Sequence, residues 1–239
     1  MFDSPLPYHP APSALNIKQK TPEVFSLEPV VSLRDSHQSW GELLNRLPVF
    51  PQTEEQWINW YLALPALVPI AIERHQVDTV SINVDSDHLL SRRIFETLEN
   101  FRGLPVMFEW TENRKENVDT RELWAAARRL DHLRSEGFSI IFDDVGSGED
   151  SLGRMCLITP DIVKIAGLLF QTARHNQRVY DILKGQIAFY ANQGIPVVIE
   201  WIESTEDLRM AMDLGATWGQ GYYWTKGAGA ISETRAKAV

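Results

Sequence analysis

The sequence predicts a single-domain α/β protein, a TIM-like (β/α)8 barrel. Short runs rich in Val, Ile and Phe alternate with longer segments of helical period, which is the pattern of strands joined by crossover helices. Eight such runs occur in 239 residues, a length that one barrel fills. Most of the runs end in a polar residue, as strands do where a barrel gathers its functional side chains.

The predicted strands and helices follow one another along most of the chain. The strands cover residues 24–33, 39–44, 79–84, 105–110, 138–144, 161–166, 196–201 and 217–224. Helices are predicted between most of them, at residues 85–101, 120–137 and 204–215. The last two helices run into Gly137 and Gly215, where a C-terminal cap is expected because glycine adopts the left-handed conformation at little cost.

The chain divides into a barrel and two tails. Residues 1–22 are rich in proline and show no clear periodicity, so we expect a flexible Pro-rich tail there. We assign residues 23–228 to the barrel domain and residues 229–239 to a C-terminal tail.

Composition excludes several kinds of partner. The formal net charge of -9 opposes attraction to nucleic acid and to anionic lipid, so we expect neither a direct nucleic-acid partner nor a membrane. The longest apolar stretch, residues 60–72, contains two prolines and is too short to span a bilayer. No secretory signal opens the chain, and a single cysteine fits a reducing compartment, so we expect a cytoplasmic protein.

Polar residues stand at the carboxyl ends of seven predicted strands. They are Glu42, Asn83, Glu109, Asp143 with Asp144, Lys164, Glu200 and Gln220. One acid at such a position is commonly a solvated edge or the cap of the next helix. Because the carboxyl ends of barrel strands meet at one mouth, the repetition indicates a shared site.

A ring of acids at that mouth needs compensating positive charge. Like charges at short range raise one another's pKa and oppose ionisation. Lys164 and Arg46 would offset part of the negative charge, and Glu112 and Glu203 would add to it. A site so rich in carboxylates, with no His or Cys nearby in the sequence, favours the hard divalent cations Mg²⁺ or Mn²⁺.

The adjacent pair Asp143 and Asp144 predicts a two-metal site. One carboxylate of such a pair can bridge two cations while its neighbour holds the second, and paired cations assist the attack of water on a phosphodiester. The reaction class is therefore metal-assisted phosphodiester hydrolysis, with Lys164 or Glu200 placed to orient or deprotonate the water.

Seven short motifs carry the polar residues of the predicted ring along the chain. They are "GELLNR", "SINVDS", "EWTE", "DDVGSGEDSL", "VKIA", "EWIE" and "QGYYW". In this order they resemble E-A-L-x-R, a strand ending in N-L-S, E-[IVL]-T-E, D-D-F-G-T-G-Y-S-S-L, L-K-I-D, E-G-V-E and Q-G-Y-L-F. These are the motifs of the EAL domain family, which hydrolyses the bacterial second messenger cyclic di-GMP to linear pGpG. The likeness covers about residues 23–225.

The resemblance implies a role for each matching residue. Metal binding is implied for Glu42, Asn83, Glu109, Asp143 and Asp144. Handling of the attacking water is implied for Lys164 and Glu200. Support of the loop after the Asp pair, and of the groups behind the metal ligands, is implied for Glu112 and Glu203. Contact with the ligand is implied for Arg46 at a phosphate, Glu28 at a guanine edge and Gln220 at the far wall. Cyclic di-GMP is the implied partner, and a homodimer or a regulatory protein partner is left open.

Departures from the family pattern keep a second function in view. Ala166 stands where the family has an aspartate, and Glu28 stands where it has a glutamine. Glu149 and Asp150 replace a tyrosine and a serine after the Asp pair, and Trp201 and Trp110 replace smaller residues. The alternative is a catalytically inactive EAL-like protein that binds cyclic di-GMP or a regulatory partner. We expect both tryptophans to fill the barrel.

A different metal-dependent barrel, such as an enolase-type enzyme, would also place acids and a lysine at strand ends. It normally needs a separate capping domain, for which the chain has no room.

Overall fold

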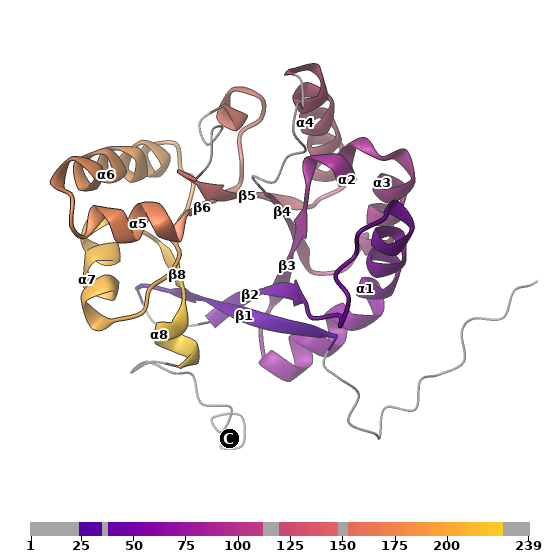
Figure 1. The fold of residues 1–239 in the computed structure, drawn as a ribbon, viewed down its shortest axis with the longest axis horizontal. Helices are drawn as coiled ribbons and strands as arrows, with labels where there is room; N and C mark the ends of the chain where they lie inside the picture. The colour runs from indigo at the N-terminus through magenta and orange to yellow at the C-terminus, as the bar shows by residue number, and fades with distance from the viewer. Residues whose placement is uncertain (1–23, 35–37, 112–119, 148–152, 227–239) are drawn as a thin grey trace, which may run out of the picture.

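The computed structural model describes residues 24–34, 38–111, 120–147 and 153–226. In this part of the chain eight strands form a closed barrel in which sequence neighbours pair in order and β8 pairs with β1 (Figure 1). The predicted TIM-like barrel is confirmed. The two predicted tails, residues 1–22 and 229–239, lie outside the described residues.

All eight predicted strands are present, most of them shorter than expected. They are β1 Phe25–Ser32, β2 Gln38–Asn45, β3 Thr79–Val84, β4 Val106–Trp110, β5 Ser139–Val145, β6 Ile162–Ile165, β7 Val197–Ile199 and β8 Trp218–Gln220. The prediction for residues 217–224 is wrong in its second half, which forms a helix. The chain turns there at Gly221 (φ 150°), where a Cβ would overlap the backbone of Ile202.

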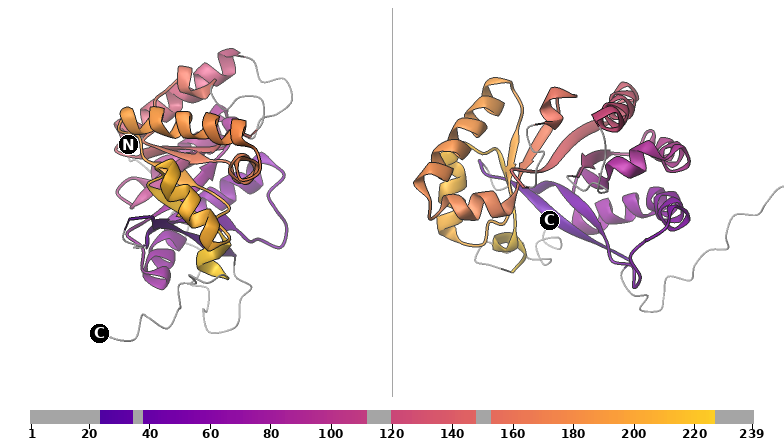
Figure 2. Two further views of the ribbon diagram at one scale, coloured as in Figure 1. Left: turned by 90° about the vertical axis from the view of Figure 1, so that its left-hand side faces the viewer. Right: turned by 45° about the horizontal axis from the view of Figure 1, so that its top comes forward.

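Helices cover two sides of the barrel: in the right-hand view of Figure 2, α5–α8 (orange to yellow) lie on one side and α1–α3 (purple to magenta) on the other. They are α1 Glu54–His75, α2 Ser86–Leu90, α3 Arg92–Leu98, η1 Glu99–Phe101, α4 Thr120–Ser135, η2 Arg154–Cys156, α5 Gly167–Ala173, α6 Gln177–Asn192, α7 Thr205–Leu214 and α8 Tyr222–Thr225. The helix predicted at 85–101 is divided at Ser91, whose extended backbone ends α2 and whose side chain caps α3.

The first strand runs against its neighbours. β1 is antiparallel to both β2 and β8, whereas the pairs from β2 to β8 are parallel. The five residues between β1 and β2, 33–37, are too few for a crossover, which takes a dozen or more, so β1 and β2 are adjacent antiparallel strands. Their register sets Glu28 directly opposite Glu42, and this brings a mid-strand residue of β1 to the barrel mouth.

Helix α1 carries the longest apolar stretch. Thr53 and Gln56 form a capping box at its start, and Pro65 and Pro69 lie inside it. Its inner face, which includes Tyr61 and Leu64, is fully buried. Among the described residues, no helix combines the length and the apolar character that crossing a membrane requires.

Period-two alternation along the strands places two layers inside the barrel. A lower apolar layer consists of Val30, Trp40, Ile141 and Val198, with Met107, Ile162 and Trp218 packed against it. The residue two positions nearer the mouth on each of these strands is polar: Glu28, Glu42, Asp143, Glu200, Glu109, Lys164 and Gln220. The main apolar core lies between the barrel and the helices. The polar layer therefore lies directly on a packed apolar floor.

Candidate active site

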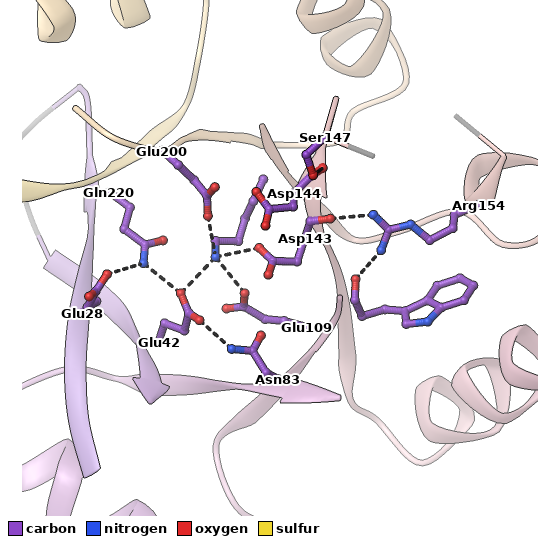
Figure 3. A network of polar contacts seen from close by, with 12 residues as sticks. Glu28, Glu42, Asn83, Glu109, Asp143, Asp144, Ser147, Arg154, Glu200 and Gln220 are labelled. Carbon is purple, nitrogen blue, oxygen red and sulfur yellow. Dashed lines mark hydrogen bonds and ion pairs between the residues drawn. The ribbon is translucent and has the colours of Figure 1, made fainter. Parts of the chain in front are cut away.

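One lysine stands at the centre of the polar layer. Lys164 Nζ lies 3.0 Å from Glu42 Oε2, 2.9 Å from Glu109 Oε2, 2.8 Å from Asp143 Oδ1 and 2.9 Å from Glu200 Oε1. The side chain is only 1% exposed. Figure 3 shows the four carboxylates, from β2, β4, β5 and the end of β7, pointing toward one another. The structure thus brings these five predicted site residues together.

Two amide side chains complete the cluster. Asn83 Nδ2 donates to Glu42 Oε1 at 2.7 Å, and Gln220 Nε2 donates to Glu42 Oε2 at 2.9 Å and to Glu28 Oε2 at 3.2 Å (Figure 3). Both amides thus turn their nitrogen toward carboxylates. Within the described part of the chain, three oxygens of this cluster are buried without a hydrogen-bond partner: Asn83 Oδ1, Glu109 Oε1 and Gln220 Oε1.

Burial changes the acidity of three carboxyl groups in the cluster. It raises the pKa of Glu200 to about 8, with the charges of Asp143 and Asp144 acting in the same direction and Lys164 opposing them. Burial also raises the pKa of Glu109 well above its usual value, again against the effect of Lys164. The pKa of Asp143 is raised for the same reason. Without additional cations, the site therefore holds protons on part of its carboxyl groups at neutral pH.

Glu42 and Lys164 keep their charges. Burial would raise the pKa of Glu42, but the charge of Lys164 and the hydrogen bonds from Gln220, Asn83 and Lys164 lower it overall. Burial would lower the pKa of Lys164, but the surrounding acids raise it well above 10.5. An ammonium group facing an ionised Glu42 is thus the fixed ion pair of the cluster.

Asp144 stands apart from Lys164. Its backbone is in the left-handed region (φ 52°), and Ser147 N donates to its carbonyl at 3.0 Å. Ser147 Oγ donates to the same carbonyl at 2.9 Å. This turn at the end of β5 sets Asp144 on the boundary of two adjoining pockets, both of which it lines.

Two pockets meet above the cluster. The larger, of about 510 Å³, is lined by Glu42, Asp143, Lys164 and Glu200, and also by Glu28, Glu203 and Gln220. The smaller, of about 300 Å³, is lined by Asn83, Asp143 and Arg46 together with Trp57 and His88. The two share Leu44, Asp143 and Asp144, so a ligand can extend to both sides of the Asp pair.

The remaining predicted residues lie toward the rim. The Arg46 side chain is 52% exposed, lies 4.0 Å from Glu28 Oε1 and donates from Nε to Ser26 Oγ at 2.8 Å. Glu203 is exposed, and its backbone N–H donates a hydrogen bond to Asp207 Oδ2 at 3.1 Å. Glu112, Glu149 and Asp150 lie outside the described residues.

Sequence reasoning missed a buried arginine beside the site. Arg154, which is 2% exposed, donates to the backbone carbonyls of Trp110 (2.5 Å) and Asp143 (2.6 Å), at the ends of β4 and β5 (Figure 3). Its guanidinium also lies over the rings of Trp110 and Phe142. Because the arginine lies in the loop after β5, no strand periodicity marks it.

The prediction that both tryptophans fill the barrel is wrong. Trp110 is fully buried, but it packs in the main apolar core between the barrel and the helices, where its Nε1 donates to Ser86 Oγ of α2 at 2.9 Å. Trp201 is 53% exposed and lines the larger pocket. Its backbone is left-handed (φ 56°), a conformation that no sequence pattern indicates.

The cluster offers oxygen ligands to a cation but holds a lysine in their midst. No three His, Cys, Asp or Glu side chains in the described ranges form a ready metal site, and Lys164 Nζ occupies the point where four carboxylates meet. The buried, unpartnered Asn83 Oδ1 and Glu109 Oε1 are nonetheless oxygens of the type that Mg²⁺ and Mn²⁺ bind. The donor set therefore fits hard divalent cations.

A family model described as the EAL domain matches residues 63–227. Among curated proteins, cyclic di-GMP phosphodiesterase RocR from Pseudomonas aeruginosa is 29% identical over 153 residues, or 62% of this chain and 38% of RocR. Cyclic di-GMP phosphodiesterase PdeB from Shewanella oneidensis is 34% identical over 149 residues, or 60% of this chain and 17% of PdeB. The chain thus spans well under half the length of these relatives.

Solved structures share the fold. An EAL domain protein from Listeria monocytogenes superposes with a TM-score of 0.70 at 16% identity, covering 85% of this chain and 87% of that one. A stand-alone EAL protein from Vibrio cholerae, solved in its c-di-GMP-bound form, gives a TM-score of 0.69 at 21% identity, with 87% and 94% covered. At these identities the likeness shows the fold alone.

Proposed function

Because the chain belongs to the EAL domain family, we propose that it hydrolyses cyclic di-GMP to linear pGpG and so controls second-messenger signalling. The observation that carries this proposal is the convergence of Glu42, Glu109, Asp143 and Glu200 within 3.0 Å of Lys164 Nζ at the barrel mouth. Relatives that bear the name cyclic di-GMP phosphodiesterase support it.

The pocket suits a dinucleotide in size but repels it in charge. Its volume of about 510 Å³ lies within the range of roughly 300 to 1,000 Å³ typical of small-molecule sites. The carboxylates that line it would oppose a ligand with two phosphates. Cations are therefore part of the proposal, in a two-metal site for Mg²⁺ or Mn²⁺ held by Glu42, Asn83, Glu109, Asp143 and Asp144. Such ions neutralise phosphate charge and make water more acidic.

Two residues of the chain are proposed to handle the attacking water. Glu200 has a pKa raised to about 8 by burial, so its carboxyl group can exchange a proton near neutral pH, as a general base requires. Lys164 remains charged and orients Glu200 through a contact of 2.9 Å. Glu203 and Glu112 are proposed to support the loop that follows Asp143 and Asp144 and the groups behind the metal ligands.

Three further residues are proposed to bind the ligand. Glu28 and Gln220, joined by a 3.2 Å hydrogen bond, form the wall at which we place a guanine edge, because carboxylate and amide oxygens accept from guanine N–H groups. Arg46, in the smaller pocket, is placed at a phosphate.

A second function is favoured by one feature of the site. Ala166, which is 1% exposed, follows β6 where the family motif has an aspartate, so this position offers no carboxylate beside Lys164. A protein with weakened cation binding would retain the pocket without turnover. The second candidate is therefore a catalytically inactive protein that binds cyclic di-GMP or a regulatory protein partner.

Incubation of the purified protein with cyclic di-GMP and Mg²⁺ or Mn²⁺ separates the two functions. We expect linear pGpG from the parent protein and none from Asp143→Asn, while Asp213→Asn, an exposed residue of α7, should behave as the parent. Arg46→Ala should mainly raise KM. Binding without product would support the second function, and neither binding nor product would leave a protein partner as the ligand. Equal rates for Asp143→Asn and the parent would contradict the proposed hydrolysis mechanism.

A further inference from the structure

Trp201 occupies an unusual position for a large apolar residue. It follows Glu200 directly, is 53% exposed, and lines the pocket of about 510 Å³. The preceding carboxylate contacts Lys164 at 2.9 Å. The indole is thus placed at the mouth of the pocket, one residue away from the catalytic cluster.

The backbone of Trp201 is held in a conformation that tryptophan rarely adopts. Its φ of 56° lies in the left-handed region, which is unfavourable for a bulky side chain and is commonly retained where function requires it. The carbonyl of Trp201 accepts a hydrogen bond from Gln171 Nε2 of α5 at 2.8 Å. This bond fixes the peptide that follows the residue.

Gly167 makes room for the indole. A Cβ at Gly167, the first residue of α5, would overlap three ring atoms of Trp201. The ring therefore packs directly against the backbone at the start of α5. With its backbone and one side of its ring fixed, Trp201 loses little further freedom when a ligand contacts the exposed part of the ring.

We propose that Trp201 is a specificity-determining residue that stacks on one nucleobase of the ligand. The proposal rests on the proposed function and deepens it by assigning a base subsite. A flat, uncharged ring suits the face of a base, since the polar lining of the pocket is largely acidic and would repel phosphate. Tyr222, also 53% exposed, lines the same pocket and adds a second aromatic surface.

Substitutions that tolerate the left-handed backbone test the ring itself. Trp201→Gly and Trp201→Asn both suit a positive φ, whereas Trp201→Phe keeps an aromatic surface. Removal of a stacking aromatic should raise KM for cyclic di-GMP about 5- to 150-fold, with kcat changed much less, and Trp201→Phe should restore most of the affinity. Trp124→Ala, at an exposed tryptophan of α4 outside both pockets, is the matched control.

A binding measurement separates the base from the phosphate. Isothermal titration with GMP in the presence of Mg²⁺, which offsets the phosphate charge, should show the same loss of affinity in Trp201→Gly, whereas ribose 5-phosphate, which has no base, should bind the parent and the variant alike. GMP should also quench tryptophan fluorescence in the parent more than in Trp201→Phe. Both readouts are independent of turnover.

Gly167→Ala provides an independent approach. The added methyl displaces the indole, so this variant should weaken GMP binding in the parent. In the Trp201→Gly background it should have little further effect, because the ring with which it clashes is absent. If the losses of GMP affinity in the two single variants add up in the double variant, Gly167 affects GMP binding through a group other than Trp201, and this would contradict the proposal.

The outcomes distinguish this inference from the function on which it rests. Unchanged KM and GMP affinity in Trp201→Gly and Trp201→Asn, in a parent that hydrolyses cyclic di-GMP, would overturn the stacking role and leave the function intact. Equal losses for GMP and ribose 5-phosphate would also overturn it. A parent that binds neither cyclic di-GMP nor GMP would remove both proposals.

Discussion

Asn83 donates its side-chain amide to Glu42 across 2.7 Å, which leaves Asn83 Oδ1 buried with no partner among the described residues. An unpaired buried carbonyl costs free energy unless a ligand satisfies it. We expect Asn83→Ala to raise the Kd for Mn²⁺ at least about tenfold, the scale of effect seen when groups that support a bound metal are removed. Titration of Mn²⁺ followed by electron paramagnetic resonance measures this without substrate. Asn192→Ala, on the exposed face of α6, is the control. If Asn83→Ala binds Mn²⁺ as tightly as the parent, Asn83 is not part of the cation site.

Lys164 is the internal counter-charge of the cluster, with four carboxylate oxygens at 2.8 to 3.0 Å. Lys164→Met should lower the free energy of unfolding by about 3 to 5 kcal/mol in EDTA at pH 8, because buried carboxylates lose their partner. The loss should shrink at pH 5, where more of these groups are protonated. Mn²⁺ should restore more stability to the variant than it adds to the parent, since it can replace the missing charge.

Chemical denaturation with and without Mn²⁺ measures these differences. Lys184→Met, at an exposed lysine of α6, should change little. A variant as stable as the parent at pH 8 in EDTA would show that the cluster does not need the ammonium.

The raised pKa of Glu200 predicts that the cation-free protein becomes less stable as pH rises. Its carboxyl group has a pKa of about 8 in the folded state, against a usual value of 4.5. The folded protein therefore holds a proton that the unfolded chain releases, and the associated stability is complete below about pH 4.5 and is lost as pH rises to about 8. A single proton gives a slope of at most about 1.4 kcal/mol per pH unit.

Comparison with Glu200→Gln isolates this effect, because glutamine does not titrate. Both proteins are measured in EDTA from pH 5 to pH 8.5. As pH rises, the unfolding free energy of the parent should fall relative to that of Glu200→Gln. A constant difference would mean that Glu200 ionises at its ordinary pKa.

The cluster could be predicted from sequence because two simple rules place it. Alternation along a strand puts Glu109 and Asp143 on the same side as Met107 and Ile141, and a closed barrel brings the ends of its strands together. The antiparallel pairing of the first strand can also be predicted, because the five residues 33–37 that join it to the second strand are too few for a crossover.

Contacts between distant segments leave no periodic signal. The position of the Trp201 ring depends on a positive φ and on Gly167, a residue of a different element that leaves room for the ring. The sequence predicts that Lys164 offsets the acids and handles the attacking water, but it does not fix which side chain reaches the centre of the four acids. These features depend on the three-dimensional packing of side chains rather than on the order of residues along one strand.

Arg154 joins the ends of β4 and β5 beside the site. Its guanidinium donates to Trp110 O from β4 and to Asp143 O from β5, residues 44 and 11 positions away in the chain. Arg154→Met leaves both buried carbonyls without these donors, so we expect a loss of about 2 to 6 kcal/mol in unfolding free energy, from roughly 1 to 3 kcal/mol for each buried polar group left unpaired. Urea denaturation measures this loss, and Arg209→Met, at a 70% exposed arginine of α7, is the control.

Because the Asp143 carbonyl loses its hydrogen bond to Arg154, Mn²⁺ affinity should also fall. Arg154→Lys should recover part of the stability, since lysine can reach only one carbonyl well, and a fully stable Arg154→Met would show that the two strand ends hold their positions without the arginine.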